Sequence, residues 1–329
     1  MYGRDHERVA AALWKRFGYI AASRLVVVIR SSIRAIRGDP FLRVGDQMCR
    51  DLERMSSASL ERLLRPARRN LKLHGRSLTR SSGLLTREIP IRTFGEWKRV
   101  APGFVQMDTV GHEGGQSTQG CAFTLCLTDI CSGWTERRAV ANRGVRAIRP
   151  ALQEIRSNIP FPLVHLHTDN GSEFINYSLL NYCKSTGTGI SRSRAGRKND
   201  NCWVEQKNFD TVRKLTGYAR YDTPEAVELL NDLYRTQAAL QNYVYPSQKL
   251  IEKIRIGSRQ IRRFDAPQTP AMRVLHHPEV SSETKKSIRL ALAVINPLQL
   301  ADKVSELQRS LISLAHRYPD VSSLRQVPL

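Results

Sequence analysis

A short apolar run that stops at an acid limits the folds open to this chain more than any other feature. Residues 161–174 have the sequence FPLVHLHTDNGSEF, and the run up to Thr168 has the composition of a buried strand. Asp169 comes next, and Asn170 and Gly171 form a dipeptide that is typical of tight turns. The segment therefore predicts a strand that ends in a carboxylate.

Strand and helix patterns alternate on both sides of this run. A strand pattern ends at Asp108, two more flank a turn at Gly133, and the helical pattern that follows is interrupted at Pro150. Further helical patterns come after the run, and one of them contains Glu205. The order of strand, hairpin, helix, strand, helix and helix predicts an α/β fold with a mixed sheet.

The charge of the chain is large and unevenly distributed. The 329 residues have a formal net charge of +22, and arginine outnumbers lysine. Residues 1–100 have a net charge of +13, residues 101–245 of +2 and residues 246–329 of +7. Two basic flanks around a nearly neutral middle are typical of a protein that binds a polyanion. We expect nucleic acid as the partner, with acidic membranes or acidic proteins as the alternatives.

Three parts follow from these patterns. Residues 1–90 are expected to be a helical, helix-turn-helix-like DNA-binding region with a linker, in which Ser57 or Ser59 caps a helix that Pro66 breaks or kinks. Residues 91–245 are expected to form the α/β core. Residues 246–329 are expected to be a basic C-terminal extension that is partly helical. The basic residues proposed to contact DNA in the first part are Arg65, Arg68 and Arg69.

Composition excludes several other classes of protein. With 41% hydrophobic residues the chain can form a core, which excludes a disordered chain. No apolar run reaches the roughly 18 residues of a membrane span, so no membrane anchor is expected, and the membrane is not among the expected partners. The six cysteines form no C-x-x-C pair, so neither a zinc site nor a disulfide framework is expected, and the cytoplasm is the predicted location.

Asp108, Asp169 and Glu205 form the candidate catalytic set. Adjacent strand ends would bring the two aspartates together, and the 35 residues from Asp169 to Glu205 are enough for a helix and loop to carry the glutamate back over them. Crowded carboxylates raise each other's pKa values, and two divalent cations would relieve the repulsion. Oxygen ligands of this kind favour Mg²⁺ or Mn²⁺. Taken singly, each acid has an ordinary structural explanation at a turn or on a helix surface.

The arrangement of these acids resembles the D,D(35)E core of retroviral integrases and bacterial insertion-sequence transposases. Further segments of similarity are RTFGEWKRVAPGFVQMDTVGH, LTDICSGW and NDNCWVEQKN. The resemblance implies an RNase H-like fold and a catalytic and metal-binding role for Asp108, Asp169 and Glu205 with two Mg²⁺ or Mn²⁺ ions. It also implies a DNA transposase or integrase that cuts and transfers DNA strands, with double-stranded DNA and a homo-multimer as partners. Its bacterial members usually have more sequence before the core, so the chain is expected to be shortened at its start.

The loop and helix before and around Glu205 supply further candidates for contact with DNA. Basic side chains next to a phosphodiester substrate would bind its backbone, and two amides share the helix face of Glu205. These candidates are Arg192, Arg194, Arg197, Lys198, Asn201 and Asn208.

Two alternatives to a transposase remain open from the sequence. One is a catalytically silent DNA-binding protein derived from a transposase, although all three acids are present. The other is an RNase H-like nuclease that only hydrolyses its substrate.

Overall fold

The computed structural model describes residues 2–68, 89–97, 100–115, 120–194, 198–256 and 259–315. Arg69 and Arg197 and most of the predicted linker lie outside these ranges. The side chain of Lys198 is also not described.

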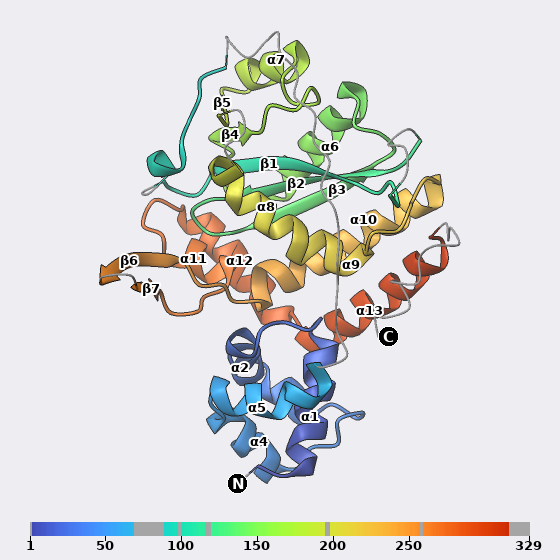
Figure 1. Cartoon of the computed structure of the whole chain (residues 1–329), viewed down its shortest axis with the longest axis vertical. Helices are drawn as coiled ribbons and strands as arrows, with labels where there is room; N and C mark the ends of the chain where they lie inside the picture. Colours follow the sequence, from blue (N-terminus) through green and yellow to red (C-terminus); the bar gives the residue numbers. More distant parts are fainter. Residues whose placement is uncertain are drawn as a thin grey trace.

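A five-stranded mixed sheet forms the centre of the molecule (Figure 1). Its strands are β1 (Phe104–Gly111), β2 (Phe123–Asp129), β3 (Thr135–Val140), β4 (His165–Thr168) and β5 (Gly189–Arg192). The spatial order is β3-β2-β1-β4-β5. The first three strands are antiparallel neighbours, whereas β4 runs parallel to both β1 and β5. Apolar and β-branched residues dominate β1 and β2, as expected for strands covered on both faces.

Helices cover both faces of the sheet. On one face lie α6 (Val145–Asn158) and α7 (Tyr177–Ser185), which share a core with Val105 and Met107 of β1. On the other face lie α8 (Cys202–Asn208), the π-helical turn η3 (Phe209–Arg213), α9 (Lys214–Thr216), α10 (Pro224–Ala239) and the second π-helical turn η4 (Leu240–Val244). Residues 106 and 108 of β1 alternate with 105 and 107 and therefore point to this second face.

A buried arginine attaches the second helical layer to the edge strand β3. The Arg137 side chain donates to the carbonyl of Thr211 at 2.6 Å and to Oε1 of Gln237 at 2.5 Å. Its guanidinium also lies over the ring of Tyr234, 5.3 Å from the centroid. Because these groups belong to η3 and α10, one side chain of β3 fixes both elements.

The N-terminal helices form a bundle below the sheet in Figure 1. They are α1 (Arg4–Arg16), α2 (Ala22–Ser31), α3 (Ile33–Arg37), α4 (Asp46–Arg54) and α5 (Ser57–Arg68). Their apolar faces share one core with α10 and with the C-terminal helix α13 (Pro297–Ser313). The hydroxyl of Ser56 accepts the backbone N–H of Ser59, so Ser56 takes the capping role that we expected of Ser57 or Ser59.

The remaining elements surround the core of the chain. The 3₁₀ turn η1 (Phe94–Trp97) precedes β1, and a second such turn, η2 (Lys198–Asn201), precedes α8. After η4 come a two-stranded sheet of β6 (Leu250–Ile256) and β7 (Arg259–Phe264), and the helices α11 (Pro270–His276) and α12 (Ser282–Val294). Among the residues described, no helix has both the length and the apolar composition to cross a bilayer.

Neither Pro66 nor Pro150 ends its helix, so the expected break at Pro66 and interruption at Pro150 were wrong, whereas a kink at Pro66 stays a prediction. Pro66 lies inside α5 and Pro150 inside α6. Each proline removes one backbone hydrogen bond at a cost of roughly 3 kcal/mol. In α6 the buried side chains of Ile148, Leu152 and Ile155 pack against the sheet, and burial of three such side chains offsets this cost.

The predicted fold class is confirmed: an α/β fold with an RNase H-like mixed sheet flanked by helices, and a helical N-terminal region. The division at residues 90 and 245 stays a prediction.

Candidate active site

Strand pairing brings Asp108 and Asp169 to the same level of the sheet. The parallel register of β1 and β4 pairs Met107 with Thr168. Asp108 follows Met107 and Asp169 follows Thr168, so the two carboxylates come from neighbouring positions on β1 and just after β4. This juxtaposition was predicted from sequence.

The position of Asp108 within its strand differs from the expectation that the strand would end there. β1 continues to Gly111, and Asp108 is paired with Cys126 of β2. The β-branched residues Thr109 and Val110 extend the strand beyond the acid. Asp169, by contrast, directly follows β4, as predicted.

The turn after β4 is held by hydrogen bonds that orient Asp169. Its Oδ1 accepts the backbone N–H of Gly171 at 3.0 Å. Asn170 donates to the carbonyl of Ser193 at 3.0 Å and accepts from Arg192 at 3.2 Å. A Cβ at position 171 would lie 2.8 Å from the carboxylate of Glu173, so glycine leaves room for the acids around it.

Gln106 connects β1 to the start of α8. Its side chain is fully buried, and Oε1 accepts the backbone N–H groups of Trp203 at 3.0 Å and Val204 at 3.2 Å. Its Nε2 donates to the carbonyl of Asp200 at 2.8 Å. The N–H groups of Trp203 and Val204 belong to the first turn of α8 and have no acceptor within the helix, so Gln106 of β1 acts as the N-terminal cap of α8. No role for Gln106 was predicted from the sequence.

Asp108 lies under α8 in an unfavourable environment for its charge. Burial holds the pKa of its carboxyl well above the ordinary value, and the charges of Asp169, Glu205 and Glu173 raise it further. The backbone N–H of Thr109 acts in the opposite direction. Burial also raises the pKa of Asp169, and Glu173 adds to that effect.

Two side chains from other elements reach this pair of aspartates. Asn208, in the last turn of α8, donates to Oδ2 of Asp108 at 2.6 Å. Glu173 accepts from the hydroxyl of Thr109 at 2.9 Å. Glu205 is exposed on α8, three residues before Asn208, and its charge acts on Asp108. Glu173, which is not among the candidates from sequence, therefore lies near enough to the two aspartates for its charge to act on both.

The donor set has the chemistry of a site for hard divalent cations. The groups are carboxylate oxygens whose mutual repulsion raises the pKa of Asp108, and a cation would relieve this repulsion. Their side-chain positions are not those of a complete ligand set: within the described ranges, no group of three or more His, Cys, Asp or Glu side chains could hold a metal ion. The gathering of all three acids into one metal site therefore stays a prediction.

The residues predicted to contact DNA have varied surroundings. Arg194 forms two hydrogen bonds with the buried carboxylate of Asp200, at 2.8 and 2.9 Å. Arg192 donates to the carbonyl of Ile89, and Asn201 is buried, which places its side chain away from the surface. Contact of any of them with DNA stays a prediction.

The N-terminal candidates differ in exposure. Arg65 is exposed on α5. Arg68 forms an ion pair with Glu61 and lies over the ring of Trp14, 5.3 Å from its centroid.

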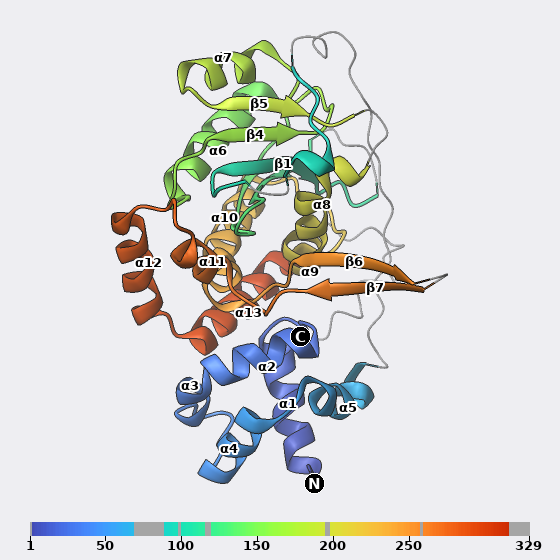
Figure 2. The same ribbon diagram turned by 90° about the vertical axis from the view of Figure 1, so that its left-hand side faces the viewer.

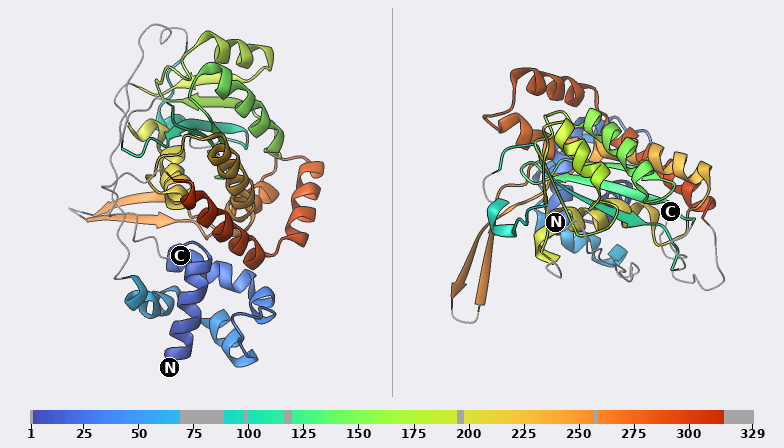
Figure 3. Two further views of the ribbon diagram at one scale, coloured as in Figure 1. Left: turned by 90° about the vertical axis from the view of Figure 1, so that its right-hand side faces the viewer. Right: turned by 90° about the horizontal axis from the view of Figure 1, so that it is seen from above.

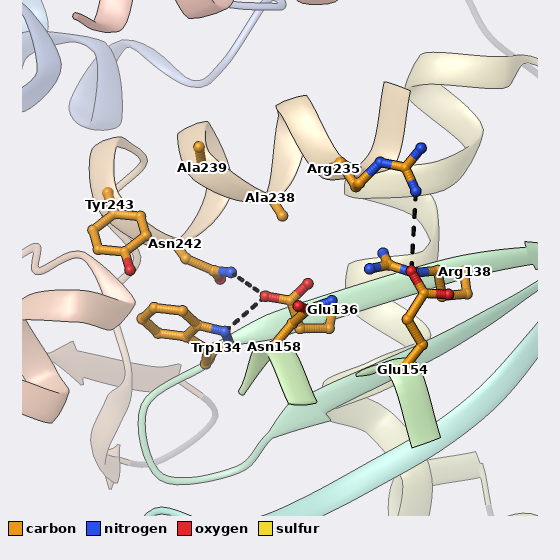
Figure 4. A pocket seen from close by; sticks show the side chains of 10 residues that line it. All are labelled: Trp134, Glu136, Arg138, Glu154, Asn158, Arg235, Ala238, Ala239, Asn242 and Tyr243. Carbon is orange, nitrogen blue, oxygen red and sulfur yellow. Dashed lines mark hydrogen bonds and ion pairs between the residues drawn. The ribbon is translucent and has the colours of Figure 1, made fainter. Parts of the chain in front are cut away.

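A pocket of about 360 Å³ lies over β3 and is separate from the aspartates (Figure 4). Glu136 accepts there from Trp134 at 2.9 Å and from Asn242 at 3.3 Å. Arg138 and Arg235 both lie near Glu154, at 2.7 and 4.0 Å. Because Arg138 and Arg235 pair with Glu154 and Glu136 accepts from Trp134 and Asn242, this pocket is a weaker candidate for catalysis than the crowded acids.

Comparison by sequence with curated proteins finds a relative. The chain is 37% identical over 272 residues to the uncharacterized protein y4rM of Sinorhizobium fredii, a match that covers 83% of this chain and 78% of y4rM. No protein-family model matches the chain.

Among solved structures, the catalytic core domain of BIV integrase aligns with a TM-score of 0.35 and 16% identity, over 52% of this chain and 93% of that one. The dimeric HTLV-2 integrase catalytic core in complex with magnesium aligns with a TM-score of 0.35 and 16% identity, over 45% of this chain and 92% of that one.

Proposed function

For this chain, which belongs to the family of y4rM of Sinorhizobium fredii, we propose the activity of a polynucleotidyl transferase that cuts DNA and joins the freed end to a second DNA. Such an enzyme is a DNA transposase or integrase. The observation that carries the proposal is the register of the parallel strands β1 and β4, which brings Asp108 and Asp169 to neighbouring positions beneath the helix that bears Glu205.

The carboxylates would hold the cofactor. Asp108 and Asp169 would share two Mg²⁺ or Mn²⁺ ions, and Glu205 would complete the second site. When bound, such ions activate a nucleophilic oxygen and stabilise the oxygen that leaves phosphorus. The contribution of this chain is to hold the three acids on two strands and one helix, with Gln106 fixing the start of the helix relative to the first strand.

The proposed reaction needs no protein nucleophile. The oxygen of water forms a bond to phosphorus, the bond from phosphorus to the 3′ oxygen breaks, and a 3′-hydroxyl is released. That hydroxyl then attacks a phosphodiester of the target DNA. The bond from this phosphorus to the 3′ oxygen of the target strand breaks, and the 3′-hydroxyl of the target strand is released. Two DNA ends must be held together for transfer, so we propose a homo-multimer on double-stranded DNA. The net charge of +22 supports a DNA substrate.

Asp169→Asn tests the proposal. This variant should bind a DNA duplex with nearly the affinity of the unchanged chain and should lose Mg²⁺-dependent nicking and strand transfer, because an amide is a poor ligand compared with a carboxylate. EDTA should abolish nicking by the unchanged chain, and Mn²⁺ should restore it. Products are resolved on denaturing gels with end-labelled DNA.

Asp232→Asn is the matched control, since Asp232 is exposed on α10 and paired only with Arg235 among the described ion pairs. It should nick DNA normally. Full activity of Asp169→Asn would refute the assignment. Binding of DNA without any nicking by the unchanged chain would favour the silent DNA-binding protein.

A further inference from the structure

The hairpin formed by β6 and β7 stands away from the rest of the molecule (Figures 2 and 3). Leu250 to Lys253, Arg255 and Gln260 to Phe264 are exposed, and Ile254 is partly buried. An isolated two-stranded ribbon is at best marginally stable in water. A ribbon that projects in this way is therefore a candidate for contact with a partner.

The two faces of the hairpin differ in charge. Lys253 is directly opposite Arg262, and Arg255 is opposite Gln260. On the other face Glu252 forms an ion pair with Arg263 at 3.3 Å, and Ile254 is opposite Ile261. The first face, which we call the basic face, carries Lys253, Arg255 and Arg262, and neither of these two register pairs contains an acid.

The opposed cations on the basic face have a cost that an anion would remove. Like charges directly across a strand pair destabilise the pairing. Lys253 and Arg262 form no ion pair with any residue in the described part of the chain, whereas Arg263 on the other face does. The basic face is therefore arranged for a negatively charged partner.

The root of the hairpin is fixed to the body. Lys249, just before β6, donates from Nζ to the carbonyls of Ile130 (2.8 Å) and Cys131, beyond the end of β2. Asp265, just after β7, accepts the backbone N–H of Lys249 at 2.6 Å and pairs with Arg273 of α11 at 2.6 Å. Because both strands are held where they leave the body, the basic face has a defined position relative to the sheet.

That position is on the side of the candidate active site. In Figure 2 the hairpin extends toward the same side as the ends of β4 and β5, below α8. Burial raises the pKa of the Cys202 thiol, at the start of α8, to about 11, and the charge of Lys253 lowers this pKa. The basic face therefore lies near enough to the start of α8 for its charge to act there. Glu205 lies three residues after Cys202.

We propose that the basic face of the β6–β7 hairpin binds the phosphate backbone of double-stranded DNA next to the candidate active site. The proposal rests on the function proposed above and names the element that holds the substrate. A two-stranded β-ribbon has the width to enter the major groove, and ribbons bind DNA in several protein families. The Glu252–Arg263 face would then point away from the backbone.

The test is Lys253→Gln combined with Arg262→Gln, with binding to a short DNA duplex measured by fluorescence anisotropy over a range of salt concentrations. If each cation contacts one phosphate, the slope of log affinity against log salt should become less negative by about 1.8, and affinity should fall on the order of 50-fold at about 0.1 M salt. The two binding curves should converge near 1 M salt.

The matched control is Lys286→Gln combined with Arg289→Gln, which removes the same charge from exposed positions on α12. It should leave the slope and affinity near those of the unchanged chain. Circular dichroism and thermal unfolding confirm that both double variants fold.

Each outcome decides the matter. Equal slopes for the hairpin variant and the unchanged chain overturn the proposal, even where nicking is observed. An altered oligomeric state with unaltered DNA affinity also overturns it and assigns the hairpin to contact with a second copy. Loss of affinity with no nicking by the unchanged chain supports the hairpin and refutes the proposed enzyme. Absence of DNA binding by the unchanged chain refutes both.

Discussion

Asp108 shows at the scale of one residue how the candidate site conflicts with stability. Its side chain is partly buried, and burial together with the charges of Asp169, Glu205 and Glu173 opposes its charged form. Asn208 and the backbone N–H of Thr109 donate hydrogen bonds to it. An acid in such surroundings is a candidate for a role in catalysis, since the fold alone would be better served by a neutral group.

Asp108→Asn should therefore raise the stability of the chain at neutral pH. The folded-state pKa lies above the unfolded value, so the favourable contribution of protonated Asp108 is complete below the unfolded pKa, about 3.9. It is lost as the pH rises through the folded-state pKa. The variant should exceed the unchanged chain by about 1 kcal/mol at pH 7, or a few degrees in Tm, and the difference should shrink toward pH 4.

Thermal unfolding from pH 4 to pH 8 measures this difference. Asp232→Asn, at an exposed site, should show no such pH-dependent gain. A less stable Asp108→Asn at pH 7 would show that the carboxylate is stabilised by its surroundings.

At the scale of elements, the relation between β1 and α8 depends on Gln106. This side chain makes three hydrogen bonds to backbone groups of residues 200, 203 and 204. The helix it caps carries both Glu205 and Asn208, so the placement of the third acid relative to the first follows from one amide.

Gln106→Met should distinguish the effect of these hydrogen bonds on the position of α8 from the effect of side-chain volume at position 106. Methionine fills similar space but leaves the N–H groups of Trp203 and Val204 without their acceptor, and unfolding free energy should fall by about 2 kcal/mol. Hydrogen exchange should accelerate in α8 more than in β2, and DNA nicking should fall while DNA affinity holds.

Gln153→Met, on the exposed side of α6, is the control and should change none of these. Unchanged exchange in α8 would mean that other contacts hold the helix.

The elements were predictable to different degrees for physical reasons. Asp169 was placed correctly because Asn170 and Gly171 form a local turn signal. Gln106 has no local signal, since its partners lie 94 to 98 residues away. The β6–β7 hairpin has a local signal, because the alternation of basic residues with Ile254 and Ile256 has the period of a strand. The segment was nevertheless predicted only as part of a basic, partly helical extension, since its charge outweighed this alternation in the interpretation.

At the scale of the whole molecule, the two ends of the described chain meet. Arg16 of α1 donates to Asp302 of α13 at 2.5 Å and to Asp39 at 2.8 Å. Apolar residues of the N-terminal helices and α13 belong to one core. A three-part division drawn along the sequence could not anticipate this contact, because residues 16 and 302 lie in its first and last parts.

Arg16→Gln should weaken this connection. Loss of charge-assisted hydrogen bonds leaves the buried carboxylate of Asp39 poorly paired, and the unfolding free energy should fall by about 2 kcal/mol. Protection from hydrogen exchange should fall in α1 and α13 and persist in the central sheet.

Arg235→Gln removes a guanidinium from an exposed pair and should cost less than about 1 kcal/mol. An equal loss in both variants would mean that the Arg16 contacts contribute no more than a surface pair does.

The hydrogen bonds of Gln106 to backbone groups of residues 200, 203 and 204 also determine where the chain can tolerate changes in length. Insertions in the turns between Asp169 and Asn201 would leave these hydrogen bonds intact, so we expect the chain to tolerate changes in length there better than near Gln106. One residue added between positions 106 and 108, or between 203 and 205, would turn an acid to the wrong side of its strand or helix. The two short intervals are therefore the ones that this geometry constrains most tightly.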